Sequence, residues 1–340
     1  MRQSLTVYGC GGCGGNIVQH FVDIPDDHDK PLFPKTTLTM LDTSDSNLAK
    51  TGKKINHFIV PGLEGAGKHR TRAYEGVESQ IMGILNDHKP SPFNIVVFSG
   101  SGGSGSVIGP LITAELLRRG LATIAVVVGS TTSAIETDNT HKTLRSLQSM
   151  ATSNKTGGRP ICMVYLENDT TRKTAEYAGA RTQIDLRIAE VIRQLAMLFG
   201  GMHRELDRTD LNNWLNWRPA FPDIPAQLVE ILVFKEDALE TTEAYKGMVI
   251  GTASVVNGDD DPIPDLDQPY SCVGYYTELT KSFAEGIPNH YYLITAMRIH
   301  GIFRKLEERL AAYKVAKNEL MAADMAGGMI SGDKDTGIVL

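Results

Sequence analysis

One stretch of the chain, residues 94–110 (NIVVFSGSGGSGSVIGP), constrains the possible folds more than any other. Residues 95–98 are apolar and mostly β-branched, which is typical of a buried central strand. A run of serine and glycine follows at 99–106, and an apolar stretch compatible with a helix extends from 107 to 120. Glycines let backbone N–H groups approach an anion, and a helix N-terminus adds partial positive charge. This strand–loop–helix unit therefore predicts a phosphate-binding loop rather than a flexible linker.

The same alternation of short apolar runs and helix-compatible segments covers the first half of the chain. Strands are predicted at 5–8, 38–41, 57–60, 121–128 and 160–166, and helices at 16–21, 73–87 and 136–150. Such an alternation is typical of an α/β fold with a doubly wound parallel sheet, in which ligands bind beyond the carboxyl ends of the strands. Apolar residues at helical spacing then predict one long amphipathic helix over 182–202.

A change in the sequence pattern after Pro219 predicts a second, smaller α/β domain with its own sheet. Strand-like segments occur at 229–234, 248–256 and 270–276, and a long helical stretch extends from 291 to 325. The last residues carry Gly, Asp and Ser without periodicity, which is typical of a disordered tail. We therefore expect a ligand-binding domain at 1–181, a central helix at 182–205, a second α/β domain at 206–288, a C-terminal helix at 289–326 and a flexible acidic tail at 327–340.

The composition argues against several classes of protein. The 340 residues carry a net charge of −6, so there is no basic excess to neutralise nucleic-acid phosphates. The sequence shows neither an apolar run of about 18 residues nor a signal peptide, and its four cysteines do not suggest a disulfide framework. We therefore expect a soluble, intracellular protein that binds neither nucleic acid nor membranes directly.

Two glycine-rich loops match known nucleotide-binding motifs only in part. Gly9, Gly11 and Gly14 follow a strand and fit the dinucleotide fingerprint, but Asp42 lies further along the chain than the acid that this fingerprint requires. A Rossmann-type NAD(P)-dependent oxidoreductase therefore remains an alternative. The segment 62–69 resembles a P-loop, except that His69 stands where a Mg²⁺-binding hydroxyl is needed.

Two further patterns favour a ligand held by the backbone. Cys10 and Cys13 form a CxxC without a second pair or a His at ligand spacing, so we expect no metal site there. Three glycine loops, at 9–15, 62–67 and 99–106, follow three predicted strands. Several such loops converging on one ligand indicate a nucleoside triphosphate held by backbone amides, without a P-loop lysine.

The glycine loops also resemble those of a known family. Residues 99–110 resemble the GGGTG[ST]G signature of the tubulin/FtsZ superfamily, 9–16 (GCGGCGGN) are similar to its first phosphate loop, and 65–67 to its third. Within the superfamily the chain is similar to the bacteriophage tubulins, through the segments 101–116, 188–190 and 206–214. The resemblance covers most of the chain and weakens after about residue 220. Ser101 departs from the signature, which has glycine at that position.

This resemblance implies a binding site for GTP with Mg²⁺ and assigns residues to it. The glycine loops would surround the phosphates, and Glu136, in the loop after the strand at 121–128, would lie near the ribose. Asn168 and Asp185 would contact guanine, because a carboxylate at the start of the long helix can accept from N1–H and the exocyclic amine. Arg181 would stack on the base. The complete set implied is Gly11, Gly12, Cys13, Gly14, Asn16, Asp42, Gly65, Ala66, Gly67, Ser101, Gly102, Gly103, Ser104, Gly105, Ser106, Glu136, Asn168, Arg181 and Asp185.

The resemblance also implies a GTPase site that is shared between subunits. Asp207 and Asp210 follow the long helix, and they would complete the site of the next subunit in a filament by orienting the attacking water. From the residues alone, a DxxD after a helix is more simply a solvated surface. A register with Asp210 and Asn213 would lack one catalytic acid, so a filament that binds GTP without hydrolysing it is a further alternative.

For the whole protein, the resemblance implies filaments whose assembly is controlled by GTP. They would position phage DNA or capsids in the cytoplasm of an infected bacterium. The acidic tail, with Asp333, Asp335 and the apolar tip 338–340, would dock on a neighbouring subunit. Basic residues of the preceding helix are a candidate receiving surface and equally a solvated helix face; they are Arg298, Arg304, Lys305, Arg309, Lys314 and Lys317.

Overall fold

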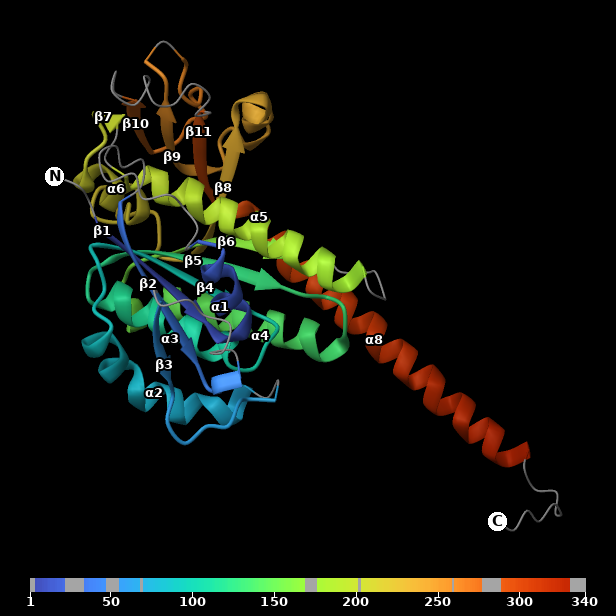
Figure 1. Cartoon of the computed structure of the whole chain (residues 1–340). Coiled ribbons are helices and arrows are strands. Elements are labelled where there is room, and N and C mark those ends of the chain that lie inside the picture. The colour runs from blue at the N-terminus through green and yellow to red at the C-terminus, as the bar shows by residue number, and fades with distance from the viewer. Residues whose placement is uncertain are drawn as a thin grey trace.

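The computed structural model of the chain describes residues 4–21, 34–46, 55–67, 70–168, 176–200, 203–258, 260–276 and 289–330. The strands in these ranges form one 11-stranded sheet in the order β3-β2-β1-β4-β5-β6-β8-β11-β9-β10-β7. Helices cover both faces of the sheet, and the long helix α8 projects from the body of the molecule (Figure 1). No helix in the described ranges has the length and hydropathy that crossing a membrane requires.

The first six strands form the doubly wound parallel sheet that the sequence predicts. Each neighbouring pair in the order β3-β2-β1-β4-β5-β6 is parallel. β5 is buried at every residue because helices cover both faces: α1 and α5 pack on one, and α2, α3 and α4 on the other. The elements are β1 (Ser4–Cys10), α1 (Gly11–Gln19), β2 (Lys35–Asp42), β3 (Ile55–Ile59), α2 (Arg70–Asp87), β4 (Phe93–Ser99), α3 (Gly105–Arg118), β5 (Ala122–Gly129), α4 (Ala134–Thr152), η2 (Asn154–Thr156) and β6 (Ile161–Glu167).

The central helix α5 (Glu176–Leu198) runs back along the sheet from the carboxyl ends of the strands to their amino ends. Its 23 residues span about 34 Å at the usual rise of an α-helix. At its far end, the ring of Phe199 stacks on that of Phe93, the first residue of β4, with centroids 4.4 Å apart. The helix therefore connects the two ends of the parallel sheet. It begins six residues before the predicted start at 182 and ends before the predicted end at 202.

The prediction that the second half has its own sheet was wrong. β8 pairs with β6 through three residue pairs, Ile161–Leu228, Cys162–Val229 and Met163–Glu230, so the sheet is continuous. The outer edge of β6 carries backbone groups that need partners, and β8 supplies them. The elements of this half are β7 (His203–Arg204), α6 (Arg208–Leu215), β8 (Leu228–Lys235), η3 (Glu236–Tyr245), β9 (Val249–Val256), β10 (Tyr270–Tyr276), β11 (His290–Thr295) and α8 (Met297–Ile330).

Two boundaries of the predicted C-terminal helix also need correction. Residues 290–295 form the buried strand β11 between β8 and β9, because aromatic and β-branched side chains fit a central strand better than a helix. The helix begins only at Met297, whose N–H donates to the Thr295 hydroxyl. At the other end α8 continues to Ile330, so the first four residues of the predicted tail at 327–340 are helical. The rest of the tail, 331–340, lies outside the described residues.

Candidate functional site

The N-termini of α1 and α3 meet at the carboxyl end of the sheet. Gly11, at φ +71°, packs so closely that a Cβ on it would lie 2.6 Å from the Gly105 nitrogen. A Cβ on Gly105 would in turn lie 2.6 Å from the Cys10 carbonyl oxygen. Neither N-cap residue, Cys10 or Ser104, caps its helix with a side-chain hydrogen bond. Two sets of helix N-terminal amides, each with partial positive charge, therefore face the same place and suit an anionic ligand.

Helix α1 starts earlier than predicted, at Gly11 rather than at residue 16. The predicted ligand residues Gly12, Cys13 and Asn16 thus lie on its first turns and are half-buried. Gly14 is buried, since a Cβ there would lie 2.3 Å from the Val97 carbonyl oxygen. The glycines of this loop therefore allow α1 to approach the sheet and α3 closely.

The serine and glycine loop after β4 is shaped by its own side chains. The Ser99 hydroxyl accepts hydrogen bonds from the N–H groups of Ser101 and Gly102, both at 3.2 Å. The Ser106 hydroxyl donates to the carbonyls of Gly102, at 2.6 Å, and Gly103, at 3.1 Å. These bonds support the conformation of the loop. Residues 101–106 therefore lie together at the carboxyl end of β4.

Two residues that the sequence analysis missed fix this loop from outside. The Thr43 hydroxyl lies 2.6 Å from that of Ser104, and the Thr43 N–H donates to the Asp42 carboxylate at 2.7 Å. The Gly65 N–H donates to the Thr43 carbonyl at 2.8 Å, which brings the loop after β3 to the same place. From α4, Asn139 donates to the Ser101 carbonyl at 3.1 Å. The sequence could have indicated Thr43, because its hydroxyl comes directly after an acid at a strand end. No local pattern in the sequence indicated Asn139.

The loop between β5 and α4 contributes a closed polar network. Glu136 accepts hydrogen bonds from the hydroxyls of Ser130, at 2.9 Å, and Thr132. Its own N–H donates to Ser133, the N-cap of α4. Glu136 therefore belongs to the first turn of α4 and not to the loop, where the sequence analysis placed it. An acid at this position is favoured by the helix dipole.

Two of the three predicted base-contacting residues have described side chains. Asn168 follows β6 directly, and its buried Oδ1 has no hydrogen-bond partner among the described residues. An orphaned acceptor of this kind suits a donor on a ligand, such as a base amine. Asp185 is half-buried in the interior of α5 rather than at its start, because the helix begins at Glu176. The Arg181 side chain lies outside the described residues.

The predicted acid pair lies at the opposite end of the sheet. Asp207 is the N-cap of α6 and accepts from the N–H groups of Thr209 and Asp210, while the Asp210 carboxylate accepts from the Asp207 N–H, which completes a capping box. The Tyr270 hydroxyl lies 3.3 Å from the Asp210 carbonyl oxygen. Tyr270 is the first residue of β10, which runs in the same direction as β1–β6, so the pair sits at the amino ends of these strands.

The electrostatics of the acid pair keep Asp207 ionised. The backbone N–H groups of Asp210 and Thr209 lower the pKa of the Asp207 carboxyl, because they stabilise its charged form. Asp207 is exposed and Asp210 half-buried. An exposed, ionised carboxylate beside a second one can serve a helix cap, a general base or both.

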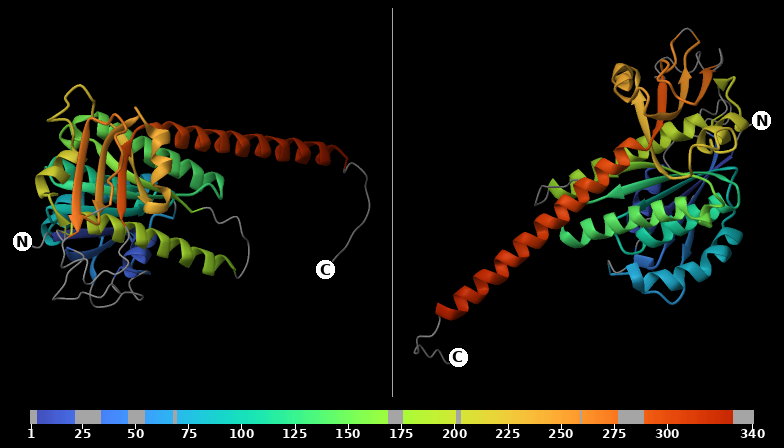
Figure 2. Two further views of the ribbon diagram at one scale, coloured as in Figure 1. Left: turned by 90° about the horizontal axis from the view of Figure 1, so that it is seen from above. Right: turned by 180° about the vertical axis from the view of Figure 1, so that it is seen from behind.

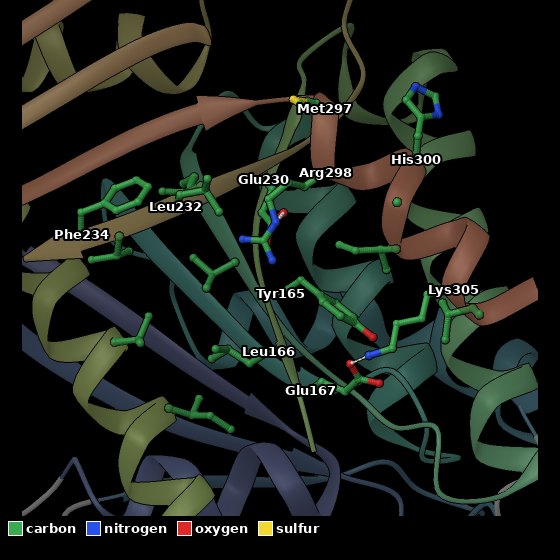
Figure 3. Close-up of a pocket in the computed structure, with 18 of the residues that line it drawn as sticks. Tyr165, Leu166, Glu167, Glu230, Leu232, Phe234, Met297, Arg298, His300 and Lys305 are labelled. Atoms are coloured by element: carbon green, nitrogen blue, oxygen red, sulfur yellow. Dashed lines mark hydrogen bonds and ion pairs between the residues drawn. The ribbon is translucent and has the colours of Figure 1, made fainter. Parts of the chain in front are cut away.

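A large cleft lies away from the glycine loops, where β6 and β8 separate beyond their three paired residues (Figure 3). It has a volume of about 1040 Å³ and is lined by α5, α8 and the two strands. Glu230, in the last residue pair between β6 and β8, is 1% exposed, with the Arg298 guanidinium Nε 3.5 Å from its Oε2. On the other side of the cleft, Lys305 pairs with Glu167 at 2.5 Å. Arg298 and Lys305, two members of the predicted basic surface, thus already have acidic partners in this chain.

Comparison with known proteins identifies the first half of the chain. Residues 4–156 match the Tubulin/FtsZ family, GTPase domain. A phage tubulin-like protein of Pseudomonas phage PhiPA3 is 32% identical over 226 residues, which cover 66% of this chain and 65% of that protein. The first half of this chain is thus similar to the GTPase domain of the tubulin/FtsZ family. The match covers the glycine loops at 9–15, 62–67 and 99–106, and the alternative of an oxidoreductase is not supported.

Solved structures extend the likeness to the second half. The protofilament of TubZ from bacteriophage PhiKZ is 25% identical and aligns with a TM-score of 0.76 over 98% of this chain and 95% of that one. The GDP-bound structure of the phage tubulin PhuZ aligns with a TM-score of 0.80 over the same shares of the two chains. At 22% identity this second likeness shows the shared fold.

Proposed function

We propose that this tubulin-like chain binds GTP with Mg²⁺, hydrolyses it and assembles into filaments in which each active site is completed by the next subunit. The observation that carries the proposal is the placement of two features at opposite ends of one sheet. The helix N-termini at Gly11 and Gly105 lie at the carboxyl ends of the strands, and the Asp207–Asp210 pair lies at the amino ends. The two ends are separated by α5, about 34 Å long.

This separation explains why a single subunit would hydrolyse GTP slowly. The carboxylates of Asp207 and Asp210 cannot reach a nucleotide bound by their own chain, since the whole sheet lies between them. Stacking two copies head to tail would bring the acid pair of one subunit against the glycine loops of the next. In that arrangement Asp210 would orient or deprotonate the attacking water, and Asp207 would hold the loop through its helix cap.

The residues at the glycine loops fit a Mg²⁺–nucleotide better than a metal held by protein alone. Within the described ranges no group of three or more His, Cys, Asp or Glu is placed to bind a metal. Mg²⁺ keeps several waters and is commonly bound through substrate phosphates with one or two protein oxygens. The neighbouring hydroxyls of Ser104 and Thr43 are the protein oxygens that would contribute. Bound there, Mg²⁺ would neutralise charge on the phosphates.

For the assembled protein we infer that the tail at 327–340 contacts a neighbouring subunit and that the filament positions phage DNA or capsids in the host cytoplasm. The tail is acidic and apolar at its tip, so a basic, partly apolar surface would receive it. Lys314 and Lys317 on α8 are exposed and carry the charge that such a surface requires. Self-assembly of this chain is supported by its likeness to the TubZ protofilament.

A complementation experiment tests the shared active site. Asp210→Ala removes the catalytic acid from one population of subunits. Gly102→Glu puts a carboxylate into the phosphate loop of a second population, at a position where a Cβ meets only Ser99, 3.8 Å away, so the fold should be kept. Phosphate release and right-angle light scattering are followed after GTP and Mg²⁺ are added to each variant and to their mixture.

We expect each variant alone to release little phosphate and the mixture to recover a substantial fraction of the wild-type rate. Recovery requires that an intact Asp210 of one chain acts on GTP bound by another. A mixture that stays inactive while it co-assembles would refute the shared site. Equal phosphate release by Asp210→Ala and the wild type would exclude Asp210 as the catalytic acid, and no GTP-dependent scattering by the wild type would argue against filaments.

A further inference from the structure

The C-terminal helix α8 contacts two loops at the nucleotide end of the sheet. The Tyr313 hydroxyl donates a hydrogen bond to the Thr131 carbonyl at 2.9 Å, across 182 positions of sequence. The Thr131 hydroxyl donates to the Glu167 carboxylate at 3.0 Å. Lys305 donates to the other oxygen of the same carboxylate, the contact drawn in Figure 3. One helix thus connects the loop after β5 with the end of β6.

Both loops carry residues that the proposed nucleotide site uses. Thr131 stands between Ser130 and Thr132, whose hydroxyls both donate to Glu136. Glu167 directly precedes Asn168, whose buried Oδ1 has no hydrogen-bond partner in the part of the chain that the structure describes. A shift of either loop would therefore move the groups expected at the ribose and the base.

The first half of α8 is anchored firmly enough to act as a support. The Arg145 guanidinium of α4 lies 4.3 Å from the centre of the Phe303 ring and donates to Glu307 at 2.8 Å. The His141 ring, also on α4, lies 3.2 Å from the same carboxylate. Beyond Tyr313 the side chains of residues 314–319 are all exposed, and the helix projects from the body (Figure 2). The contact of Lys305 to Glu167 thus lies within the anchored half of α8, and the contact of Tyr313 to Thr131 lies where the projecting half begins.

We propose that α8 belongs to the nucleotide-binding apparatus, with Tyr313 and Lys305 as positioning residues that hold the β5–α4 loop and the end of β6 in the conformation that binds ribose and base. This inference rests on the proposed function, because it assigns a support to the same site. A partner that displaces the projecting half of α8 would lower nucleotide affinity, and by linkage the nucleotide would oppose that displacement by the same factor.

The test is the affinity of the full chain for a fluorescent GDP, mant-GDP, measured below the assembly concentration. Tyr313→Phe removes one hydroxyl and keeps the ring over which the Arg309 guanidinium lies, 4.9 Å from the ring centre. Lys305→Met removes the charge and keeps the aliphatic stem. We expect each variant to raise the Kd about fivefold, the factor that corresponds to one hydrogen bond of ordinary net strength.

Matched controls come from the end of η3, where Tyr245 is half-buried and Lys246 is exposed. Tyr245→Phe and Lys246→Met should leave the Kd unchanged. Lys305→Arg should restore wild-type affinity, because the guanidinium can still donate to Glu167. In a double-mutant cycle, Glu167→Gln should weaken binding much less when Lys305→Met is already present.

The outcomes separate this inference from the proposed function. A wild-type chain that does not bind mant-GDP would overturn the proposed function itself. If the wild type binds and Tyr313→Phe and Lys305→Met match their controls, the role of α8 is refuted and the nucleotide site stands. A loss of affinity that Lys305→Arg does not rescue would also refute a positioning role for Lys305, since it would reflect general disturbance of the helix.

Discussion

Glu230 makes the stability of this protein depend on pH in a direction that the structure predicts. The carboxyl is 1% exposed where β6 and β8 separate, and its Oε2 has no hydrogen-bond partner among the described residues. The Nε of Arg298 on α8 lies 3.5 Å from this Oε2, but the Arg298 side chain is 46% exposed, so solvent screens its charge. Burial therefore raises the pKa of Glu230 from 4.5 to about 7, although Arg298 opposes the change.

The magnitude follows from linkage. Between pH 4.5 and 7 the folded chain holds the proton of Glu230 more tightly than the unfolded chain does, so the free energy of unfolding falls as the pH rises. At about 1.4 kcal/mol for each pH unit, the full loss is about 3 kcal/mol and is complete above pH 7. With the same two pKa values, about 1 kcal/mol of it is lost between pH 6 and pH 8.

The substitution Glu230→Gln isolates this effect, because glutamine has nearly the same shape and does not titrate. Urea unfolding without nucleotide, followed by circular dichroism at pH 6 and pH 8, gives the free energy of unfolding of each protein. We expect the advantage of Glu230→Gln over the wild type to be about 1 kcal/mol larger at pH 8 than at pH 6. Comparing two pH values cancels any effect of the substitution that does not depend on pH.

A control comes from Glu308 on α8, whose side chain is 72% exposed. Glu308→Gln should leave the pH dependence of stability unchanged. If Glu230→Gln and the wild type lose stability in parallel between pH 6 and pH 8, then Glu230 is ionised in the folded protein at both values. The reasoning from burial would then be refuted.

Three further predictions concern the two ends of the sheet. Gly11→Ala should lower the free energy of unfolding by about 2 to 4 kcal/mol and abolish mant-GDP binding. The reason is that φ is +71° at this residue and that its new Cβ would lie 2.6 Å from the Gly105 nitrogen. A melting temperature equal to that of the wild type would contradict the close packing. Asp207→Ala should lower the free energy of unfolding, measured by urea titration, by about 1 kcal/mol because α6 loses its N-cap, whereas Asp207→Asn should keep the cap. Equal losses of stability in the two variants would refute the capping role. Thr43→Val should weaken GTP binding about fivefold, measured by calorimetry, and leave the melting temperature unchanged. The reason is that the Ser104 hydroxyl loses the Thr43 hydroxyl, its partner at 2.6 Å. An unchanged affinity for GTP would show that Thr43 is not part of the site.

Much of the first half could be predicted from the sequence because local signals agree there. Each strand from β1 to β6 contains a short apolar segment, and three of them end in glycine loops. In a parallel sheet the carboxyl ends of the strands lie at one edge, so placing the strands also places the loops. The helix start at Gly11 was missed because glycine-rich segments have low helix propensity, and here the packing against Gly105 and Val97 overrides it.

The second half was harder to predict because its structure depends on contacts far apart in sequence. Residues 290–295 follow a helical pattern when read with the segment after them, and only burial between β8 and β9 makes them a strand. Likewise the continuity of the sheet depends on three residue pairs between β6 and β8. No local pattern distinguishes such pairing from a separate sheet.

The amino-acid sequence by itself indicated an α/β chain whose glycine loops suit a nucleotide, since loop chemistry and strand pattern are local properties. Only the tertiary structure decided where the acids lie relative to the nucleotide loops and that α8 returns to contact Thr131 and Glu167. These arrangements depend on the direction of α5 along the sheet and on the packing of α8 against α4. Such packing arises between segments as much as 182 positions apart, where a sequence pattern carries no information on distance.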